Sequence, residues 1–262
     1  MEKVKKRTYL SKLKENGFLF SELVKRDFKK KYKRTYLGML WSVLSPLLSL
    51  LVMSIVFKQF FGSKVPHYTI YLFCGNIVFS FFQDATNGGM SSLISNSAIF
   101  TKVNVPKYLF LFSRNISSLI NFSLTFTVFI LFCIIDGITF TLGFFYLIIP
   151  IACLIVFNIG VGLILSAMYV FFRDTQYLWS VFTMLLMYMS AIFYTTDSFG
   201  EYEQLFLLNP LYVYIKYFRI IVIDNGYPSI QYNLLGMAYA LIVFSIGALI
   251  YKKYNHKFLY YV

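Results

Sequence analysis

Charged residues, histidines and cysteines are scarce in this sequence, and each scarcity excludes a class of protein. Only 13% of the 262 residues are charged, against about 25% in a typical soluble domain. The three cysteines, Cys74, Cys133 and Cys153, are an odd number inside apolar runs, which argues against a disulfide framework. The two histidines, His67 and His256, lie beside no second metal-ligand residue, so no metal site is expected.

The sequence also lacks a nucleotide-binding loop. No glycine is followed by lysine, so the G-x-x-x-x-G-K-[ST] motif that cradles nucleotide phosphates is absent. Ionisable residues inside the apolar runs are few, and Asp84 is the clearest of them. Ion-coupled carriers usually carry more acidic residues at membrane depth. If the protein transports a solute, we expect a partner to supply the energy.

Apolar residues make up 58% of the chain and are gathered into long blocks. The run from Leu37 to Phe57 is about 30 Å long as a helix, which matches the bilayer core. We predict an all-α polytopic membrane protein. Its six transmembrane helices are expected at about 37–57, 68–83, 115–135, 142–172, 175–196 and 232–251. The fourth is too long for an upright span, so it must tilt, bend or project.

The distribution of basic residues predicts the orientation. Thirteen of the 24 Lys and Arg residues precede Leu37, and only four (Lys58, Lys64, Lys216 and Arg219) fall on the opposite side of the predicted membrane. By the positive-inside rule both termini are cytoplasmic. The net charge of +13 then reflects loops held at anionic lipid, and no nucleic-acid partner is expected.

Two segments outside the spans have their own patterns. Residues 1–36 include an amphipathic stretch, from Phe18 to Arg34, that is typical of a helix lying in the membrane interface. Residues 197–230 contain an apolar segment with Pro210, Lys216 and Arg219. Charges at mid-membrane are costly, so we predict a re-entrant or interfacial helical hairpin on the external side between spans five and six.

Several motifs occur in a recognisable order. They are Arg26-Asp27 with a basic run, Leu37-Gly38, Trp41, Pro46 and Phe57, then residues 96–114, then Phe172 to Thr175, then Asn209-Pro210 with Arg219, and a basic-aromatic tail. Together they resemble the permease subunits of ABC-type exporters of bacterial surface polysaccharides, namely O-antigen, capsule or teichoic acid. The stretch V-P-K-Y at residues 105–108 departs from the F-P-R-E of many members.

The resemblance implies a non-enzymatic six-span permease, residues 37–262, in the bacterial cytoplasmic membrane. Such permeases pair as homodimers and bind two copies of a separate cytoplasmic ATPase, which holds the ATP and Mg, so no cofactor is expected in this chain. They move lipid-linked polysaccharide through a channel between the two permeases. Two alternatives stay open: an ABC permease for a drug, peptide or other lipid, and a membrane-embedded transferase acting on lipid-linked sugars. The transferase should show convergent carboxylates or histidines, and the sequence does not.

The resemblance also implies residues that contact the ATPase and the substrate. The ATPase-coupling candidates are Lys102, Val103, Asn104, Val105, Pro106, Lys107, Arg173 and Asp174. Their alternative roles are a basic loop at lipid headgroups and, for Arg173-Asp174, a topology marker with a helix cap. The candidates for a gate that meets the carrier's pyrophosphate are Arg26, Asp27, Lys29, Lys30 and Lys31. The same charges would also anchor a helix on anionic lipid.

Aromatic residues are the candidates for glycan contact, because a ring offers a flat apolar face to a sugar. The channel candidates are Trp41, Phe157, Trp179, Tyr188, Phe193 and Tyr194. Alternatively, Trp and Tyr gather at membrane interfaces and Phe fills helix contacts. Asn209, Pro210 and Arg219 are the candidates in the external hairpin. Asp84 with Asn87 forms either a buried polar contact or part of a cytoplasmic substrate entrance.

Overall fold

The computed structural model describes residues 9–33, 35–61, 65–103 and 105–261, which form helices joined by turns, with no strand among them. The predicted all-α fold is confirmed. The α-helices are α1 (Tyr9–Tyr32), α2 (Trp41–Phe61), α3 (Tyr68–Ser91), α4 (Ser97–Phe100), α5 (Tyr108–Ile135), α6 (Ile148–Phe171), α7 (Thr175–Met189), α8 (Glu203–Phe206), α9 (Pro210–Val222) and α10 (Ile230–Tyr254). The short 3-10 helices are η1 (Gly38–Leu40), η2 (Ile94–Asn96), η3 (Leu142–Leu147), η4 (Asp197–Tyr202) and η5 (Lys257–Leu259).

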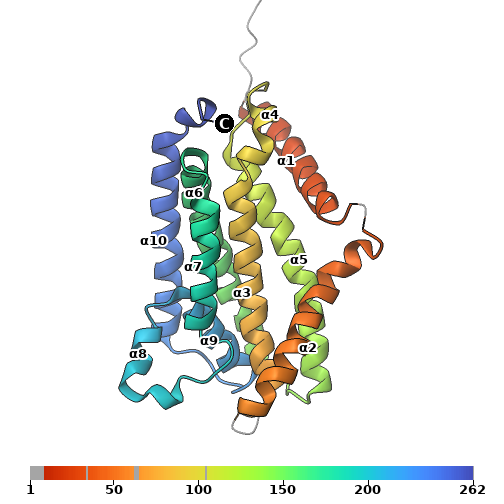
Figure 1. The fold of residues 1–262 in the computed structure, drawn as a ribbon, viewed down its shortest axis with the longest axis vertical. Coiled ribbons are helices and arrows are strands. Elements are labelled where there is room, and N and C mark those ends of the chain that lie inside the picture. Colours follow the sequence, from red (N-terminus) through yellow and green to blue (C-terminus); the bar gives the residue numbers. More distant parts are fainter. Residues whose placement is uncertain (1–8, 34, 62–64, 104, 262) are drawn as a thin grey trace, which may run out of the picture.

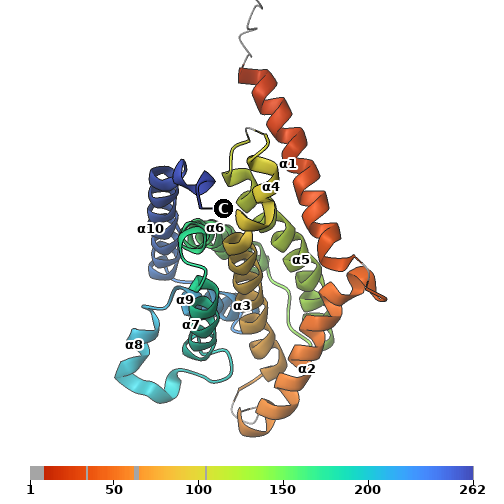
Figure 2. The same ribbon diagram turned by 45° about the horizontal axis from the view of Figure 1, so that its top comes forward.

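Helix α3 runs through the middle of the bundle. It packs on α5 and α2 on one side and on α6 on the other, and α10 lies along α6 (Figure 1). In Figures 1 and 2, α4 and the C-terminal end lie at one end of the bundle with the beginning of α1. The α8–α9 segment lies toward the opposite end. The candidate residues of the loop before α5 and those of α9 are therefore separated along the bundle axis.

Glycines bring the central helices close together. A Cβ atom on Gly160 would lie 2.6 Å from the backbone nitrogen of Phe244, and one on Gly247 would lie 2.5 Å from the carbonyl oxygen of Gly160. A Cβ on Gly89 would lie 3.0 Å from the Cα of Gly162. Small residues allow such close backbone approach where lipid gives no hydrophobic drive to association. The α3–α6–α10 core therefore depends on its glycines.

Four helical stretches among the described residues are long and apolar enough to cross a membrane: Trp41–Gln59, Tyr108–Ile135, Leu142–Phe171 and Ile230–Tyr254. They coincide with predicted spans one, three, four and six. The other two predicted spans correspond to α3, which is more polar, and to α7, whose 15 residues rise only about 22 Å. The six-span count stays a prediction.

Three helix ends differ from those expected. Helix α5 begins at Tyr108, before the predicted Asn115, because the intervening Arg114 is paired with a buried carboxylate and does not end the helix. Helix α3 continues beyond residue 83 to Ser91, packed at Gly89 against α6. Helix α7 ends at Met189, short of residue 196, because neighbouring side chains hold its end in a turn, as described below. The long fourth segment bends as expected, beginning as η3.

Candidate functional site

Helix α1 is amphipathic and lies along α5. Leu23 is buried, and Leu19 and Phe20 are partly buried against the same apolar cluster. Lys29 and Lys30 are exposed on the other side. The amphipathic pattern is thus satisfied by packing on protein as well as by any contact with lipid. The Lys31 side chain and all of Arg34 lie outside the described part of the chain.

Asp27 is the centre of a polar cluster that joins α1 to α5 and η2. Its side chain is fully buried. One carboxylate oxygen accepts hydrogen bonds from Arg26 at 2.7 and 3.1 Å. The other accepts one from Ser113 Oγ at 3.0 Å and lies 3.6 Å from Arg114 Nε. Arg26 also donates to Asn96 Oδ1 at 2.6 Å. These contacts bind α1, the candidate gate helix, to η2, which precedes the candidate coupling loop.

The candidate coupling loop follows α4, at the end of the bundle that also carries the beginning of α1 and the C-terminal end of the chain. Lys102 and Val103 are exposed, whereas Val105, Pro106 and Lys107 are partly buried. Asn104 lies outside the described residues. The loop thus presents an exposed side, as docking of a partner requires.

Lys107 ties this loop to the C-terminal segment. Its Nζ donates to the carbonyl oxygen of Asn255 and lies 5.9 Å from the ring centres of both Phe100 and Phe258. The removal of water by this packing lowers the pKa of Lys107. A push on the loop would therefore reach the C-terminal end of α10 as well as α5.

Arg173 and Asp174 form the exposed turn between α6 and α7. The Arg173 guanidinium lies 5.5 Å from the ring centre of Tyr169. Asp174 occupies the N-cap position of α7, but its side chain makes no capping hydrogen bond. The alternative role of Asp174 as a side-chain helix cap is therefore wrong in this structure. A contact with the ATPase stays a prediction.

Asn209, Pro210 and Arg219 stabilise the end of α7 from α9. Asn209 accepts a hydrogen bond from the Leu211 N–H at 3.0 Å and donates to Ser190 Oγ at 2.9 Å, and Pro210 occupies the first turn of α9. The buried Arg219 donates to two carbonyl oxygens just beyond α7, those of residues 191 and 192, at 2.9 and 3.0 Å. Both carbonyls lie in the buried turn after α7, and buried backbone carbonyls need such donors.

The six candidate channel aromatics lie in three places. Phe157 and Trp179 are buried, with ring centres 6.0 and 5.9 Å from that of Phe82. Tyr188 lies in the last turn of α7 and contacts Phe193 and Tyr194, which follow the helix; Phe193 also stacks on Phe57 at 4.6 Å. Trp41 lies at the start of α2 with 40% of its side chain exposed. Whether these residues line a channel depends on a second copy and stays a prediction.

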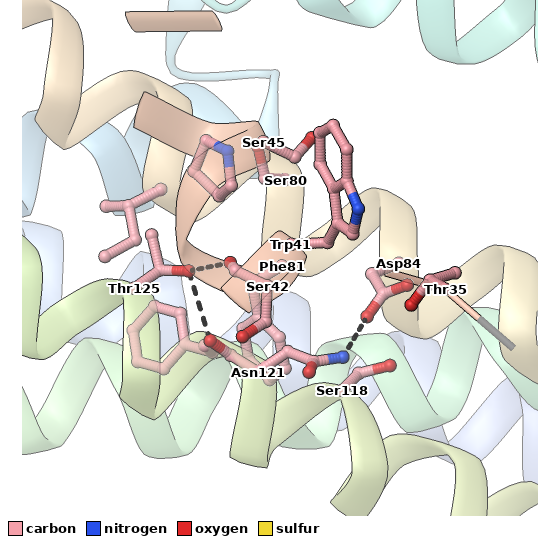
Figure 3. A pocket seen from close by; sticks show the side chains of 13 residues that line it. Thr35, Trp41, Ser42, Ser45, Ser80, Phe81, Asp84, Ser118, Asn121 and Thr125 are labelled. Carbon is pink, nitrogen blue, oxygen red and sulfur yellow. Dashed lines mark hydrogen bonds between the residues drawn. The ribbon is translucent and has the colours of Figure 1, made fainter. Parts of the chain in front are cut away.

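A cavity of about 500 Å³, with a mainly apolar surface and several polar side chains, lies between α2, α3 and α5 (Figure 3). Its lining is Thr35, Trp41, Ser42, Ser45, Pro46, Ile77, Ser80, Phe81, Asp84, Ser118, Asn121, Phe122 and Thr125. Asn121 Nδ2 donates to Asp84 Oδ2 at 3.2 Å. Thr125 Oγ1 lies 3.1 Å from the Asn121 carbonyl oxygen and 3.4 Å from that of Ser42. The partly buried Asp84 therefore makes a polar contact with Asn121 of α5, whereas Asn87, which was predicted to share a buried contact with it, is exposed.

A second cavity of about 270 Å³ continues toward the Asp27 cluster. It shares Asp84 and Asn121 with the first and adds Asn87 and Arg114. Since Arg114 also contacts Asp27, the two cavities and the α1 cluster are neighbours. Together they form a polar route within one protomer, from the end that carries the coupling loop into the bundle.

Sequence reasoning identified Asp84 and Trp41 but missed the hydroxyl and amide groups around them. Ser118, Asn121 and Thr125 are spaced three and four residues apart on α5, which places them on one face of a helix. Ser80 and Asp84 on α3 have the same relation. Such a polar stripe on a helix otherwise built of apolar residues is the signal that was available. No group of three His, Cys, Asp or Glu suited to a metal occurs among residues the structure describes.

Comparison with known proteins adds a family match and several relatives. A family model described as ABC-2 type transporter matches residues 19–223. The O-antigen export system permease protein RfbA of Klebsiella pneumoniae is 30% identical, covering 94% of this chain and 97% of that protein. RfbA of Myxococcus xanthus is 24% identical over 92% of this chain and 94% of its own length. The capsule polysaccharide export inner-membrane protein CtrC of Neisseria meningitidis serogroup A / serotype 4A is 23% identical over 79% and 80%, respectively.

Proposed function

This chain belongs to the ABC-2 type transporter family, and from that premise we propose that it is the membrane permease subunit of an ATP-driven polysaccharide exporter. Its cargo is a lipid-linked surface polysaccharide of the O-antigen or capsule class. The observation that carries the proposal is the similarity to O-antigen export permeases over nearly the whole of both chains. Family membership bears out the resemblance predicted from the ordered motifs.

The proposal includes a separate ATPase, since the sequence contains no P-loop. Two copies of this chain form the transmembrane unit and two copies of the ATPase bind ATP and Mg on its cytoplasmic side. The exposed residues Lys102 and Val103, and the turn at Arg173 and Asp174, form the docking surface. Lys107 and the Asp27 cluster transmit ATPase movement to α5, α10 and α1.

The proposed membrane arrangement keeps six spans in the bacterial cytoplasmic membrane with both termini cytoplasmic. Helices α3 and α7 cross with the four more apolar stretches; α3 is largely buried among its neighbours, whereas α7 exposes an apolar surface. The α8–α9 segment then faces outward. This orientation leaves the coupling loop, α1 and the basic C-terminal residues on the ATPase side. Teichoic acid also belongs to the proposed cargo class, but only the ordered sequence motifs support it.

Affinity purification tests the partner directly. A tagged form of the chain is extracted from its native membrane in mild detergent, and the co-purifying proteins are quantified by mass spectrometry. We expect a P-loop ATPase in a 1:1 ratio with the tagged chain. Lys107→Glu should lower the amount of recovered ATPase, whereas Lys253→Glu, at an exposed lysine near the same end, should not. Recovery of the chain alone and stable would instead favour a transferase or a carrier that needs no ATPase.

The cargo is tested in a strain that lacks the gene. Loss of surface polysaccharide with accumulation of the lipid-linked glycan inside the cell would support export of that glycan. Normal surface glycan combined with increased sensitivity to a drug or peptide would favour the alternative cargo. Both results are read from immunoblots of surface and intracellular glycan.

A further inference from the structure

We propose that the cavity between α2, α3 and α5 binds one uncharged sugar ring of the glycan, within a single protomer. This inference rests on the proposed function, because it names the part of the cargo that one site recognises. Of the six candidate channel aromatics, only Trp41 lines this cavity, and the other five do not. The inference therefore assigns Trp41 to a site within one protomer, with Asp84 and Asn121 as the other principal contacts.

The first argument is the set of buried polar side chains in an otherwise mainly apolar lining. Four polar side chains that line the cavity, Ser42, Ser118, Asn121 and Thr125, are at least nine-tenths buried in the bundle. Polar groups at membrane depth are costly unless they are paired in protein or face a water-filled space. A packed apolar interface between α2, α3 and α5 would need none of these groups. Their convergence on one space indicates that the space holds a hydrated, hydroxyl-rich ligand.

The second argument is the type of group that the lining offers. Asp84 accepts from Asn121 at 3.2 Å, and because a carboxylate has about four acceptor positions, it can also accept from sugar hydroxyls. A hydrogen bond to a charged acceptor is among the stronger kinds. The Asn121 amide and the hydroxyls of Ser80 and Ser118 add further donors and acceptors. Adjacent hydroxyls of a pyranose ring match such a set.

The third argument is the position of Trp41. In Figure 3 its indole lies across the cavity from the Asn121 and Ser118 side chains. An aromatic face packs on the C–H face of a sugar while polar groups hold its rim. The indole is 40% exposed, so it stands where a ligand can reach it. The cavity volume of about 500 Å³ lies within the range of about 300–1,000 Å³ usual for small-ligand sites.

The charge of the cavity selects the sugar over the anionic part of a lipid carrier. Asp84 would repel a pyrophosphate placed beside it. Among the described residues that line the two cavities, Arg114 is the cationic one, and it lines the second cavity and not the first. A neutral ring therefore suits the larger cavity, and an anion does not.

The two tryptophans of the chain allow a direct binding test. The permease is purified with its ATPase from cells grown on 5-fluorotryptophan, and the ¹⁹F resonance that disappears in Trp41→Phe is assigned to Trp41. Three probes are compared: the native lipid-linked oligosaccharide, the water-soluble glycan released from it by mild acid, and polyprenyl pyrophosphate without glycan. We expect the Trp41 resonance to shift with the first two probes and to stay unchanged with the third.

Asp84→Asn and a matched control link the signal to the cavity. Asp84→Asn should raise the glycan concentration needed for the Trp41 shift by about tenfold, because a charged acceptor is replaced by a weaker neutral one. The substrate concentration that gives half-maximal ATPase stimulation should rise in parallel, with the maximal rate retained. Asp136→Asn, which alters an exposed carboxylate paired with His67 outside the cavity, should change neither value.

The outcomes separate this inference from the proposed function. If the wild-type complex exports glycan but the Trp41 resonance is unchanged by released glycan, the sugar site is refuted and the exporter stands. A shift with polyprenyl pyrophosphate alone would assign the cavity to the carrier and also refute the sugar site. If no lipid-linked glycan stimulates the ATPase or is exported, the proposed function itself fails.

Discussion

Replacing Asp27 with alanine removes the carboxylate that fastens α1 to the rest of the bundle. The carboxylate is fully buried and is contacted by Arg26, Ser113 and Arg114. Its loss leaves two guanidinium groups close together and removes one of the two acceptors of the Ser113 hydroxyl, the other being the Phe110 carbonyl oxygen. We expect α1 to detach from α5 more often, while the α3–α6–α10 core stays folded.

The magnitude follows from the burial of the partners. Breaking a buried ion pair from one side costs about 3–5 kcal/mol when the remaining charge stays dry. Here the Arg26 and Arg114 side chains keep 38% and 21% of their surface exposed, so water offsets part of that cost. We expect a loss of about 2 kcal/mol in the docking of α1, or roughly 30-fold in the ratio of docked to detached helix.

Hydrogen exchange followed by mass spectrometry measures this docking. Exchange of peptides covering residues 17–33 should become roughly 30-fold faster in Asp27→Ala, in line with the docking estimate. Peptides within α6 and α10 should exchange as in the wild type. Asp27→Asn should show a smaller increase, because the amide oxygen still accepts from Ser113.

Lys25→Ala is the matched control for a charge change in the same helix. Lys25 is exposed and pairs only with Glu22 at 2.9 Å among the contacts described for it, so its removal should change docking by less than about 0.5 kcal/mol. The reasoning would be refuted if Asp27→Ala exchanged no faster than Lys25→Ala over residues 17–33. The cluster would then be a consequence of α1 packing and not its cause.

Three further changes test other parts of the structure. Gly160→Ala forces apart α6 and α10, whose backbones touch, and should cost about 1–3 kcal/mol of stability, measured as a lower melting temperature in detergent. Gly17→Ala, where the added methyl group meets open space, should leave the melting temperature unchanged. Equal melting temperatures for the two variants would contradict the close packing. Arg219→Lys keeps the charge but loses the forked donors to the carbonyl oxygens of the turn after α7. Hydrogen exchange of residues 189–196 should therefore accelerate. Unchanged exchange would show that Arg219 does not stabilise this turn. Lys107→Glu should reduce surface glycan several-fold on immunoblots while the amount of permease stays normal. Undiminished export together with full recovery of the ATPase would exclude the loop before α5 from coupling.

The sequence was sufficient to predict the helical membrane fold because its signal is local. Long apolar runs and their flanking charges depend on neighbouring residues only, and the four most apolar stretches lie where they were expected. The ends of α5 and α7 depend on distant partners. Arg114 stays within a helix because Asp27 lies beside it, and α7 stops because Asn209 and Arg219 hold its end.

The candidate site was predictable only in part for the same reason. Trp41 and Asp84 drew attention as single residues, but the cavity exists because α2, α3 and α5 converge. Asp84 and Asn121 are 37 residues apart in the chain, and neither alone indicates the pairing. The polar stripe on α5 can be read from the sequence. Which face of α2, α3 and α5 lines a shared space depends on how the three helices pack.

The most direct test of the proposed function is ATP-dependent movement of lipid-linked glycan by the purified permease and its ATPase in proteoliposomes. Lipid-linked oligosaccharide is placed in both leaflets, and a membrane-impermeant glycosidase reports the fraction exposed on one side before and after addition of ATP and Mg. The account predicts that ATP moves glycan away from the leaflet that carries the ATPase, and that a hydrolysis-deficient ATPase abolishes the movement. A complex that hydrolyses ATP at a rate unaffected by the glycan and leaves its distribution unchanged would contradict it.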